Sequence, residues 1–446
     1  MQKYLFKNIH VVNEGKIKCV DVLVKDDRIE KIENNINSNG NIKEINGENK
    51  YLFPGVIDDQ VHFREPGLIH KATISTESKA AVAGGVTSFM EMPNTIPNAL
   101  DIPTLEDKYS IAERDSWANY SFYMGVSNDN AEEAIKVNAA KERVCGLKIF
   151  LGSSTGNMLV DNHATLNRVF GESELLVAIH CEDERIIRNN YNLLKSKKPD
   201  LSPADHPVIR NEDACYESSL TAIQLAKKYN SRLHILHIST EKELQLFGNM
   251  LPLKEKRITA EVCVHHLHFT SDDYDALGYK IKCNPAIKAP SNKAALWKAL
   301  NDDRLDVIAT DHAPHLLSEK EPPYEHAHAG LPLVQHSLLL MLYYQSLGFI
   351  TLEKIAEKMS HAVADCFMIQ DRGYIREGYF ADLVTVDLKN EHKVTAKNIY
   401  YKCNWSPLEG FTFPASIIST MVNGNFVYEN GIFNESYKGQ RLLFNR

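Results

Sequence analysis

Polar side chains able to do chemistry are concentrated in the stretch Gly55–Gly67, directly after an apolar pair of residues. Side chains alternate between the two faces of a strand, so every second residue would share one face if the strand continues that far. That face would carry Asp58, Gln60, His62 and Arg64. Because buried polar groups need partners, it is not an ordinary core face. The stretch predicts a first strand that delivers metal and anion ligands to a pocket.

Further candidate ligands stand at the ends of later apolar runs. They are Lys148 in Gly-Leu-Lys, His180 in Ile-His-Cys-Glu-Asp, His237 in Leu-His-Ile-Ser-Thr and Asp311 in Thr-Asp-His-Ala-Pro-His. Three imidazoles and a carboxylate are typical of a hydrolytic Zn²⁺ site with open positions for water. Lys148 is the exception, because a protonated amine repels a metal ion. From spacing alone, a surface or ion-paired lysine is the favoured interpretation.

The elements that would position these residues alternate between strands and helices from residue 54 onward, which is typical of parallel βα units. The predicted strands are Gly55–His62, Val86–Met92, Tyr120–Val126, Gly146–Leu151, Leu175–His180, Leu233–Ile238, Ile258–Val264 and Leu305–Thr310. Eight such units predict a (β/α)8 barrel, whose active site lies at the carboxyl ends of the strands.

Both ends of the chain have β character instead. Short alternating runs occupy residues 1–53, and two more occur at Gly373–Asp387 and Ile417–Tyr428. We expect residues 1–53 and 373–446 to form a small β-sandwich domain beside a barrel of residues 54–372.

Composition excludes several classes of function. The 446-residue chain has a formal net charge of −8, which gives no reason to expect nucleic acid or a membrane surface as partner. Its longest apolar run, Leu338–Tyr344, is far shorter than the ~20 residues that span a bilayer. The eight cysteines contain no C-x-x-C pair, as expected of a reduced cytoplasmic protein.

The motifs, in their order along nearly the whole chain, resemble the amidohydrolase superfamily and, within it, dihydroorotases of the long-chain (type I) kind. The resemblance rests on His-Phe-Arg-Glu-Pro-Gly (62–67), Met-Pro-Asn-Thr (92–95), Gly-Leu-Lys (146–148), His-Cys-Glu-Asp (180–183), Asn-Pro (284–285) and Thr-Asp-His-Ala-Pro-His (310–315). It implies zinc-dependent, reversible hydrolysis of dihydroorotate to N-carbamoyl-L-aspartate in pyrimidine biosynthesis.

The same resemblance assigns roles to the candidate residues. Lys148 would carry a CO2-derived carbamate that bridges two zinc ions, one held by His180 and His237 and the other by His62 and Asp311. Asp311 would also transfer the proton. The substrate contacts would be Arg64, Asn94 and His315 for the ring carboxylate and Asn284 for the ring.

One residue departs from the family pattern, because Gln60 stands where the first histidine of His-x-His is expected. A glutamine is a poor zinc ligand. The enzyme would then hold two metals with fewer ligands or only one, or the chain would be a non-catalytic subunit that scaffolds aspartate transcarbamoylase. Other cyclic amidohydrolases, such as hydantoinase, dihydropyrimidinase or allantoinase, are the alternative function. The expected assembly is a homodimer that acts on a small molecule.

Overall fold

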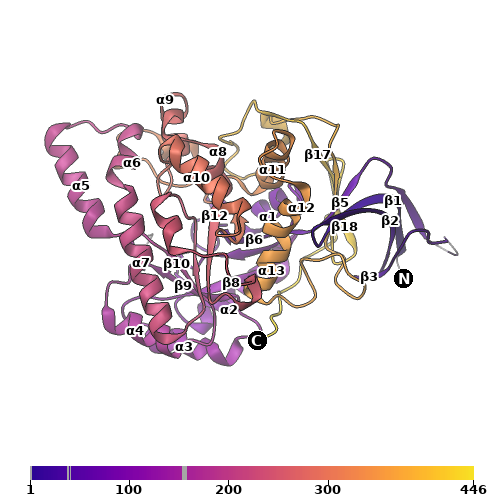
Figure 1. Cartoon of the computed structure of the whole chain (residues 1–446), viewed down its shortest axis with the longest axis horizontal. Helices are drawn as coiled ribbons and strands as arrows, with labels where there is room; N and C mark the ends of the chain where they lie inside the picture. The colour runs from indigo at the N-terminus through magenta and orange to yellow at the C-terminus, as the bar shows by residue number, and fades with distance from the viewer. Residues whose placement is uncertain (1–2, 38–39, 41, 153–157) are drawn as a thin grey trace.

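The computed structural model describes residues 3–37, 40, 42–152 and 158–446. Its centre is an eight-stranded parallel sheet that runs in chain order (Figure 1). The strands are β6 (Val56–Val61), β7 (Val86–Glu91), β8 (Asn119–Gly125), β9 (Gly146–Phe150), β10 (Val177–His180), β11 (Leu233–Ile235), β12 (Ile258–Cys263) and β13 (Val307–Ala309). The backbone N–H of His62 donates to the carbonyl of His312 at 2.7 Å, which joins the first strand to the last. The predicted barrel is therefore confirmed.

Helices follow most of these strands and cover the outside of the barrel. They are α1 (Ile74–Ala83), α2 (Ile102–Asp115), α3 (Ala131–Lys136), α4 (His163–Glu172), α5 (Glu184–Lys197), α6 (His206–Ile209), α7 (Glu212–Tyr229), α8 (Val264–His268), α9 (Tyr274–Leu277), α10 (Pro290–Asn301), α11 (Ser337–Ser346), α12 (Leu352–Ala356) and α13 (Ala362–Phe367). Several begin at a capping side chain. Asp183, for example, accepts hydrogen bonds from two backbone N–H groups of α5 and so caps the start of this helix.

The strands from the two ends of the chain share a second sheet, at the right of Figure 1. Its order is β19 (Ile432–Phe433), β18 (Asn425–Glu429), β17 (Ser416–Val422), β14 (Leu383–Asp387), β5 (Tyr51–Pro54), β1 (Lys3–Asn13), β2 (Lys16–Lys25) and β3 (Arg28–Glu33), with β4 (Lys43–Asn46) also beside β1. Two short strands, β15 (His392–Lys393) and β16 (Thr412–Phe413), pair separately. The additional sheet predicted from both termini is thus present. The domain limits at residues 53 and 373 stay a proposal.

Seven of the eight predicted barrel strands extend past the observed ends, six by one residue and Leu233–Ile238 by three. The strand β6 ends at Val61, and Arg64 beyond it has a left-handed backbone with φ of 67°. The strand β11 ends at Ile235, and His237 has φ of 41°. Non-glycine residues seldom adopt this conformation, so the alternation of a strand does not carry through it.

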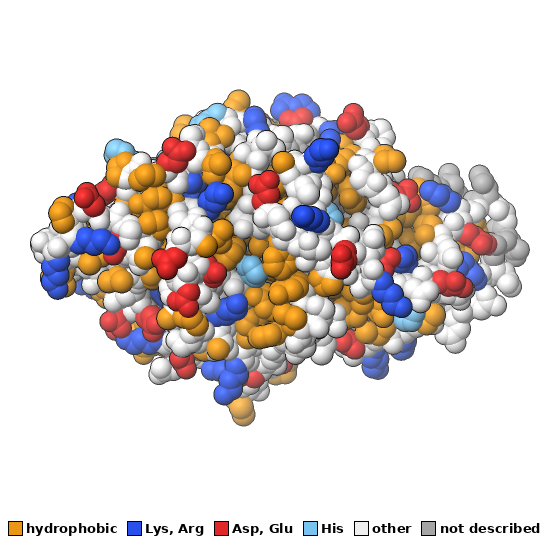
Figure 2. All heavy atoms as spheres, turned by 90° about the horizontal axis from the view of Figure 1, so that it is seen from above, with side chains coloured by type: hydrophobic (Ala, Val, Ile, Leu, Met, Phe, Trp, Pro, Cys, Tyr) orange, Lys and Arg blue, Asp and Glu red, His pale blue; other side chains and the backbone are white. Residues whose placement is uncertain are grey.

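The surface seen from above carries acidic and basic side chains interspersed with apolar ones, the largest apolar area lying near the middle of that face (Figure 2). Within the described part of the chain, no helix has both the length and the apolar character needed to cross a membrane.

Candidate active site

A cavity of about 250 Å³ opens at the carboxyl ends of the barrel strands, where the fold is expected to place an active site. Its size suits a small molecule. Eight of the residues predicted from the sequence line it: His62, Arg64, Asn94, His180, His237, Asn284, Asp311 and His315. The remaining lining residues are Gln60, Phe150, Ala313, His328, Ala329 and Gly330.

His180 and His237 face each other across one side of this cavity. The Nδ1 atom of His180 lies 3.0 Å from the Nε2 atom of His237. Two nitrogen ligands of a tetrahedral zinc ion lie about 3.3 Å apart, given Zn–N distances of about 2.0–2.1 Å. Burial and the neighbouring His180 hold the pKa of His237 well below its usual value, which keeps this ring neutral. The pair therefore fits one metal ion.

His62 and Asp311 form a second pair of possible ligands. The Nε2 atom of His62 lies 3.1 Å from Oδ1 of Asp311, and its Nδ1 atom lies 2.8 Å from Oδ1 of Asn94. When Nδ1–H donates to Asn94, the lone pair of Nε2 points at the carboxylate, so a proton or a cation must lie between them. Burial opposes ionisation of Asp311, but its interaction with the adjacent His62 holds the net pKa below its usual value.

Gln60 takes part in this second pair in a way that the sequence did not reveal. Its Nε2 group donates to the same Oδ1 atom of Asp311, at 3.1 Å. Gln60 thus forms a hydrogen bond with the Asp311 carboxylate and does not itself present a ligand atom to a metal. This arrangement makes the His62–Asp311 pair the weaker of the two possible metal sites.

Lys148 lies below the cavity floor and is fully buried. Its Nζ atom has no hydrogen-bond partner in the part of the chain that the structure describes, and burial lowers its pKa to about 7. The interpretation as a surface or ion-paired lysine is therefore wrong. A neutral amine is the form that adds CO2, and an unpartnered buried Nζ atom whose charge acts on His62, His237 and Asp311 fits a carbamate near both ligand pairs.

Arg64 also lines the cavity and is 5% exposed. Its Nε–H donates to the carbonyl of Pro314 at 3.1 Å, and Nη2 lies 3.0 Å from Nε2 of His315. Burial lowers the pKa of Arg64 to about 10, so the guanidinium stays charged at neutral pH. A buried guanidinium with one edge toward a cavity is suited to bind a carboxylate.

Lys71 strengthens this positive region and was not singled out in the sequence. Its Nζ group lies 3.1 Å from Nδ1 of His315 and 2.9 Å from Oε1 of Glu319. His315 is thus held between two cationic side chains, which together with burial keep its pKa well below the usual value. No local sequence pattern predicts a role for Lys71, because its partners His315 and Glu319 are more than 240 residues away in the chain.

The segment between residues 318 and 330 supplies one edge of the cavity through His328, Ala329 and Gly330. Lys320 fastens this edge, since its Nζ group donates to the carbonyls of Lys282, His328 and Gly330 at 2.7–2.9 Å. Asn284 beside it is oriented by His206, whose Nε2 atom lies 3.0 Å from its Oδ1 atom. His206 comes from the insertion after β10 and also escaped prediction.

A charged cluster lies deeper in the barrel and was likewise missed. Nε2 of His234 lies 3.1 Å from Asp59 and 3.8 Å from Glu261, and all three side chains are fully buried. Burial opposes protonation of His234, but the two carboxylates raise its pKa to about 9. Glu261 also accepts the backbone N–H of His237 at 2.8 Å. The cluster therefore supports the left-handed turn that presents His237.

Comparison with known proteins agrees with this fold. The family model described as "Amidohydrolase family" matches residues 51–427, and the chain belongs to that family. A dihydroorotase of Pyrococcus furiosus is 33% identical over 98% of this chain and 96% of its own. An allantoinase of Desulfitobacterium hafniense is 30% identical over 96% and 95%. The L-hydantoinase (dihydropyrimidinase) of Arthrobacter aurescens has a similar structure, with a TM-score of 0.90, 25% identity and coverage of 97% and 98%. These similarities support a hydrolase of cyclic amides.

Proposed function

We propose that the protein is a dihydroorotase, which reversibly hydrolyses (S)-dihydroorotate to N-carbamoyl-L-aspartate in pyrimidine biosynthesis. The observation that carries this proposal is the buried guanidinium of Arg64 on the cavity wall, beside His315 and Lys71. Dihydroorotate has a ring carboxylate that needs such a positive region. Rings that lack a carboxylate, such as hydantoin and dihydrouracil, would leave this buried charge without a partner.

The polar contacts to the substrate divide between two walls. Arg64 and His315 would bind the ring carboxylate, with Asn94 beside them, and Asn284 would contact the ring. This places the ring amide toward His180 and His237, across the cavity. Orienting the substrate ring in this way requires side chains held in a fixed geometry, and burial provides it.

The metal is zinc, as one or two ions. His180 and His237 would hold one ion, with a carbamate on Lys148 as a further ligand, and His62 and Asp311 would hold a second. The unpartnered Nζ atom of Lys148 and the facing nitrogens of His180 and His237 fit this set. When bound, zinc polarises a carbonyl group and lowers the pKa of water. Because Gln60 engages Asp311, we expect the His180–His237 ion to bind more tightly.

Asp311 is the proposed general base and acid. Its carboxylate lies at the cavity floor with a lowered pKa, so it is ionised at neutral pH and ready to accept a proton from water. After the ring C–N bond breaks, the same proton passes from Asp311 to the leaving ring nitrogen. In the reverse direction the carboxylate receives the proton from the attacking carbamoyl nitrogen.

A substrate series tests the proposal. The purified protein, supplied with zinc and bicarbonate, is expected to interconvert dihydroorotate and carbamoyl aspartate, with a higher kcat/KM than for hydantoin, dihydrouracil or allantoin. Arg64→Lys should raise the KM for dihydroorotate about 10–100-fold, because a bidentate charged hydrogen bond contributes about 1.5–3 kcal/mol. The exposed Arg185→Lys is the matched control.

Three results would change the conclusion. Preference for allantoin or hydantoin would favour the other cyclic amidohydrolases, which the allantoinase and hydantoinase similarities keep as the second candidate. No turnover of any ring, in a protein that binds zinc, would favour a non-catalytic subunit that associates with aspartate transcarbamoylase. An unchanged KM in Arg64→Lys would remove Arg64 from the carboxylate site. A homodimer remains the expected assembly.

A further inference from the structure

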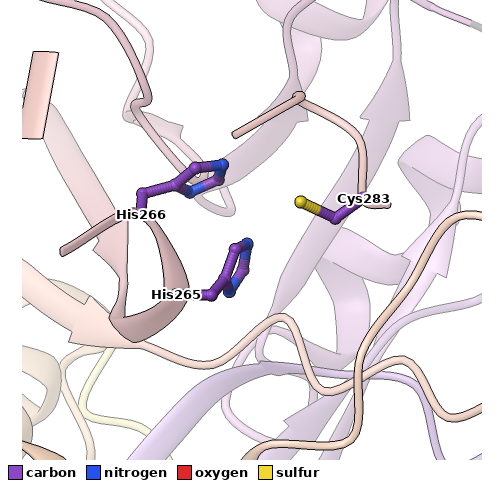
Figure 3. A group of neighbouring side chains, drawn as sticks. All are labelled: His265, His266 and Cys283. Atoms are coloured by element: carbon purple, nitrogen blue, oxygen red, sulfur yellow. The ribbon is translucent and has the colours of Figure 1, made fainter. Parts of the chain in front are cut away.

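A cluster of soft metal-ligand types lies behind the cavity wall and has no part in the proposed reaction. It consists of His265 and His266 on α8 and Cys283, which precedes Asn284. The ligand atoms of the three side chains lie within 4.8 Å of one another, and each residue is at most 3% exposed. Figure 3 shows the sulfur of Cys283 pointing toward the two rings. None of the three lines the cavity.

The hydrogen bonds of His266 prepare one of its nitrogens to bind a metal. Its Nε2–H donates to the carbonyl of Pro285 at 3.1 Å. The Nδ1 atom must then carry a lone pair, and it has no hydrogen-bond partner within the described residues. A metal-ligating histidine commonly donates its other ring N–H to a backbone carbonyl in this way, which fixes the tautomer and the orientation of the ring.

His265 is less satisfied still. Among the described residues its ring nitrogens make no well-formed hydrogen bond, only a contact with the backbone of Thr310, although the side chain is 1% exposed. Leaving such a buried group unsatisfied is unfavourable. The ring packs against that of His266, with centroids 4.2 Å apart. A ligand between the rings and the sulfur would therefore satisfy atoms that the protein itself leaves unpartnered.

Cys283 supplies the negative charge that a cation needs here. Its thiol now donates to the carbonyl of Pro285 at 3.2 Å. The ammonium group of Lys288 lies nearby, bonded to Ser239 and Ala286, and acts against any added positive charge. A thiolate offsets half the charge of a divalent ion, so binding must release the thiol proton to solvent.

We propose that His265, His266 and Cys283 form a transition-metal site, separate from the catalytic cavity, for an ion such as Zn²⁺ or Co²⁺. Two imidazole nitrogens and a thiolate are ligands that these ions prefer, and they leave a fourth position for water. A tetrahedral ion requires ligand atoms about 3.3–3.7 Å apart, so binding requires the side chains to rotate until Nδ1 of His266 faces the sulfur and the ring of His265. Because Cys283 adjoins Asn284, occupancy of this site fixes one wall of the cavity.

Metal content and spectroscopy test the site without reference to turnover, so its failure is distinct from a failure of the proposed reaction. The full-length protein is stripped with a chelator, reloaded with Co²⁺, freed of excess ion and analysed for cobalt per chain and for thiolate-to-cobalt absorption. Cys283→Ser should bind one ion fewer than the wild type and lose the thiolate absorption. Cys145→Ser is the matched control, because Cys145 is buried but belongs to no ligand cluster among the described residues.

His266→Gln keeps the thiol and provides a second test if Cys283→Ser does not fold. It should also bind one ion fewer, with the thiolate absorption lost or shifted. Far-UV circular dichroism confirms that each variant is folded. Equal cobalt content and equal spectra in the wild type and in either folded variant would overturn the proposal.

Discussion

At the scale of single residues, the site depends on buried side chains whose pKa values differ from those in water. Lys148 shows this most directly, because it is a fully buried amine without a hydrogen-bond partner in the described chain. Burial lowers its pKa to about 7, and so makes the neutral, CO2-reactive form available near physiological pH. Arg64, by contrast, keeps its charge although it is buried, which gives the cavity one wall for metals and one for an anion.

Replacing Lys148 tests the carbamate. Lys148→Ala should lose at least tenfold in zinc affinity and nearly all activity, because both proposed ions lose a shared anionic ligand. Short carboxylic acids such as acetate should restore part of the activity by occupying the space of the carbamate. Zinc per chain and turnover with and without acetate are the measurements. Unchanged zinc content in a folded Lys148→Ala variant would contradict a bridging carbamate.

At the scale of elements, most of the barrel and part of the site could be predicted from the sequence. The eight strands are apolar runs, and His62, His180, His237 and Asp311, which follow or end four of them, line one cavity. What the sequence could not reveal are contacts between distant elements. Gln60 contacts Asp311, and Lys71 contacts His315, across about 250 residues each. The left-handed turns at Arg64 and His237 are also set by such contacts.

The edge of the cavity offers a prediction at this scale. Lys320→Met removes the donor shared by three backbone carbonyls, of which two belong to residues 328 and 330 at the cavity. We expect the KM for the substrate to rise about 3–10-fold and amide hydrogen exchange across residues 318–330 to accelerate, because buried carbonyls are left unpaired. The exposed Lys298→Met is the control. Unchanged exchange in this segment would show that the edge is held by other contacts.

At the scale of the whole molecule, the second sheet is joined to the barrel by a buried polar network. Asp382 pairs with Arg372, accepts the backbone N–H of Asn423 at 2.8 Å and contacts Nδ2 of Asn119 at 3.3 Å. Asn119 is the first residue of β8, so this junction lies at the amino-terminal end of the barrel. The proposed chemistry lies at the opposite end, and the two ends of one barrel should respond to substitution independently.

Asp382→Ala and Asp387→Ala separate stability from activity. Asp382 directly precedes β14, and Asp387 is the last residue of the same strand. Asp382 is 4% exposed, and its removal leaves the Arg372 guanidinium buried without its carboxylate, at a cost of about 3–5 kcal/mol. For a chain of this length that corresponds to a fall in Tm of about 3–5 °C. Asp387 pairs with Lys50 nearer the surface, where such a pair contributes about 0–1 kcal/mol.

Thermal unfolding monitored by circular dichroism, together with kcat and KM measured well below Tm, checks both expectations. Asp382→Ala should lower Tm more than Asp387→Ala does while kcat and KM stay within about twofold of the wild type, since additivity holds for distant sites. A large loss of kcat in folded Asp382→Ala would mean that the sheet influences the cavity through the barrel. Equal Tm values for the two variants would mean that the junction does not depend on the buried pair.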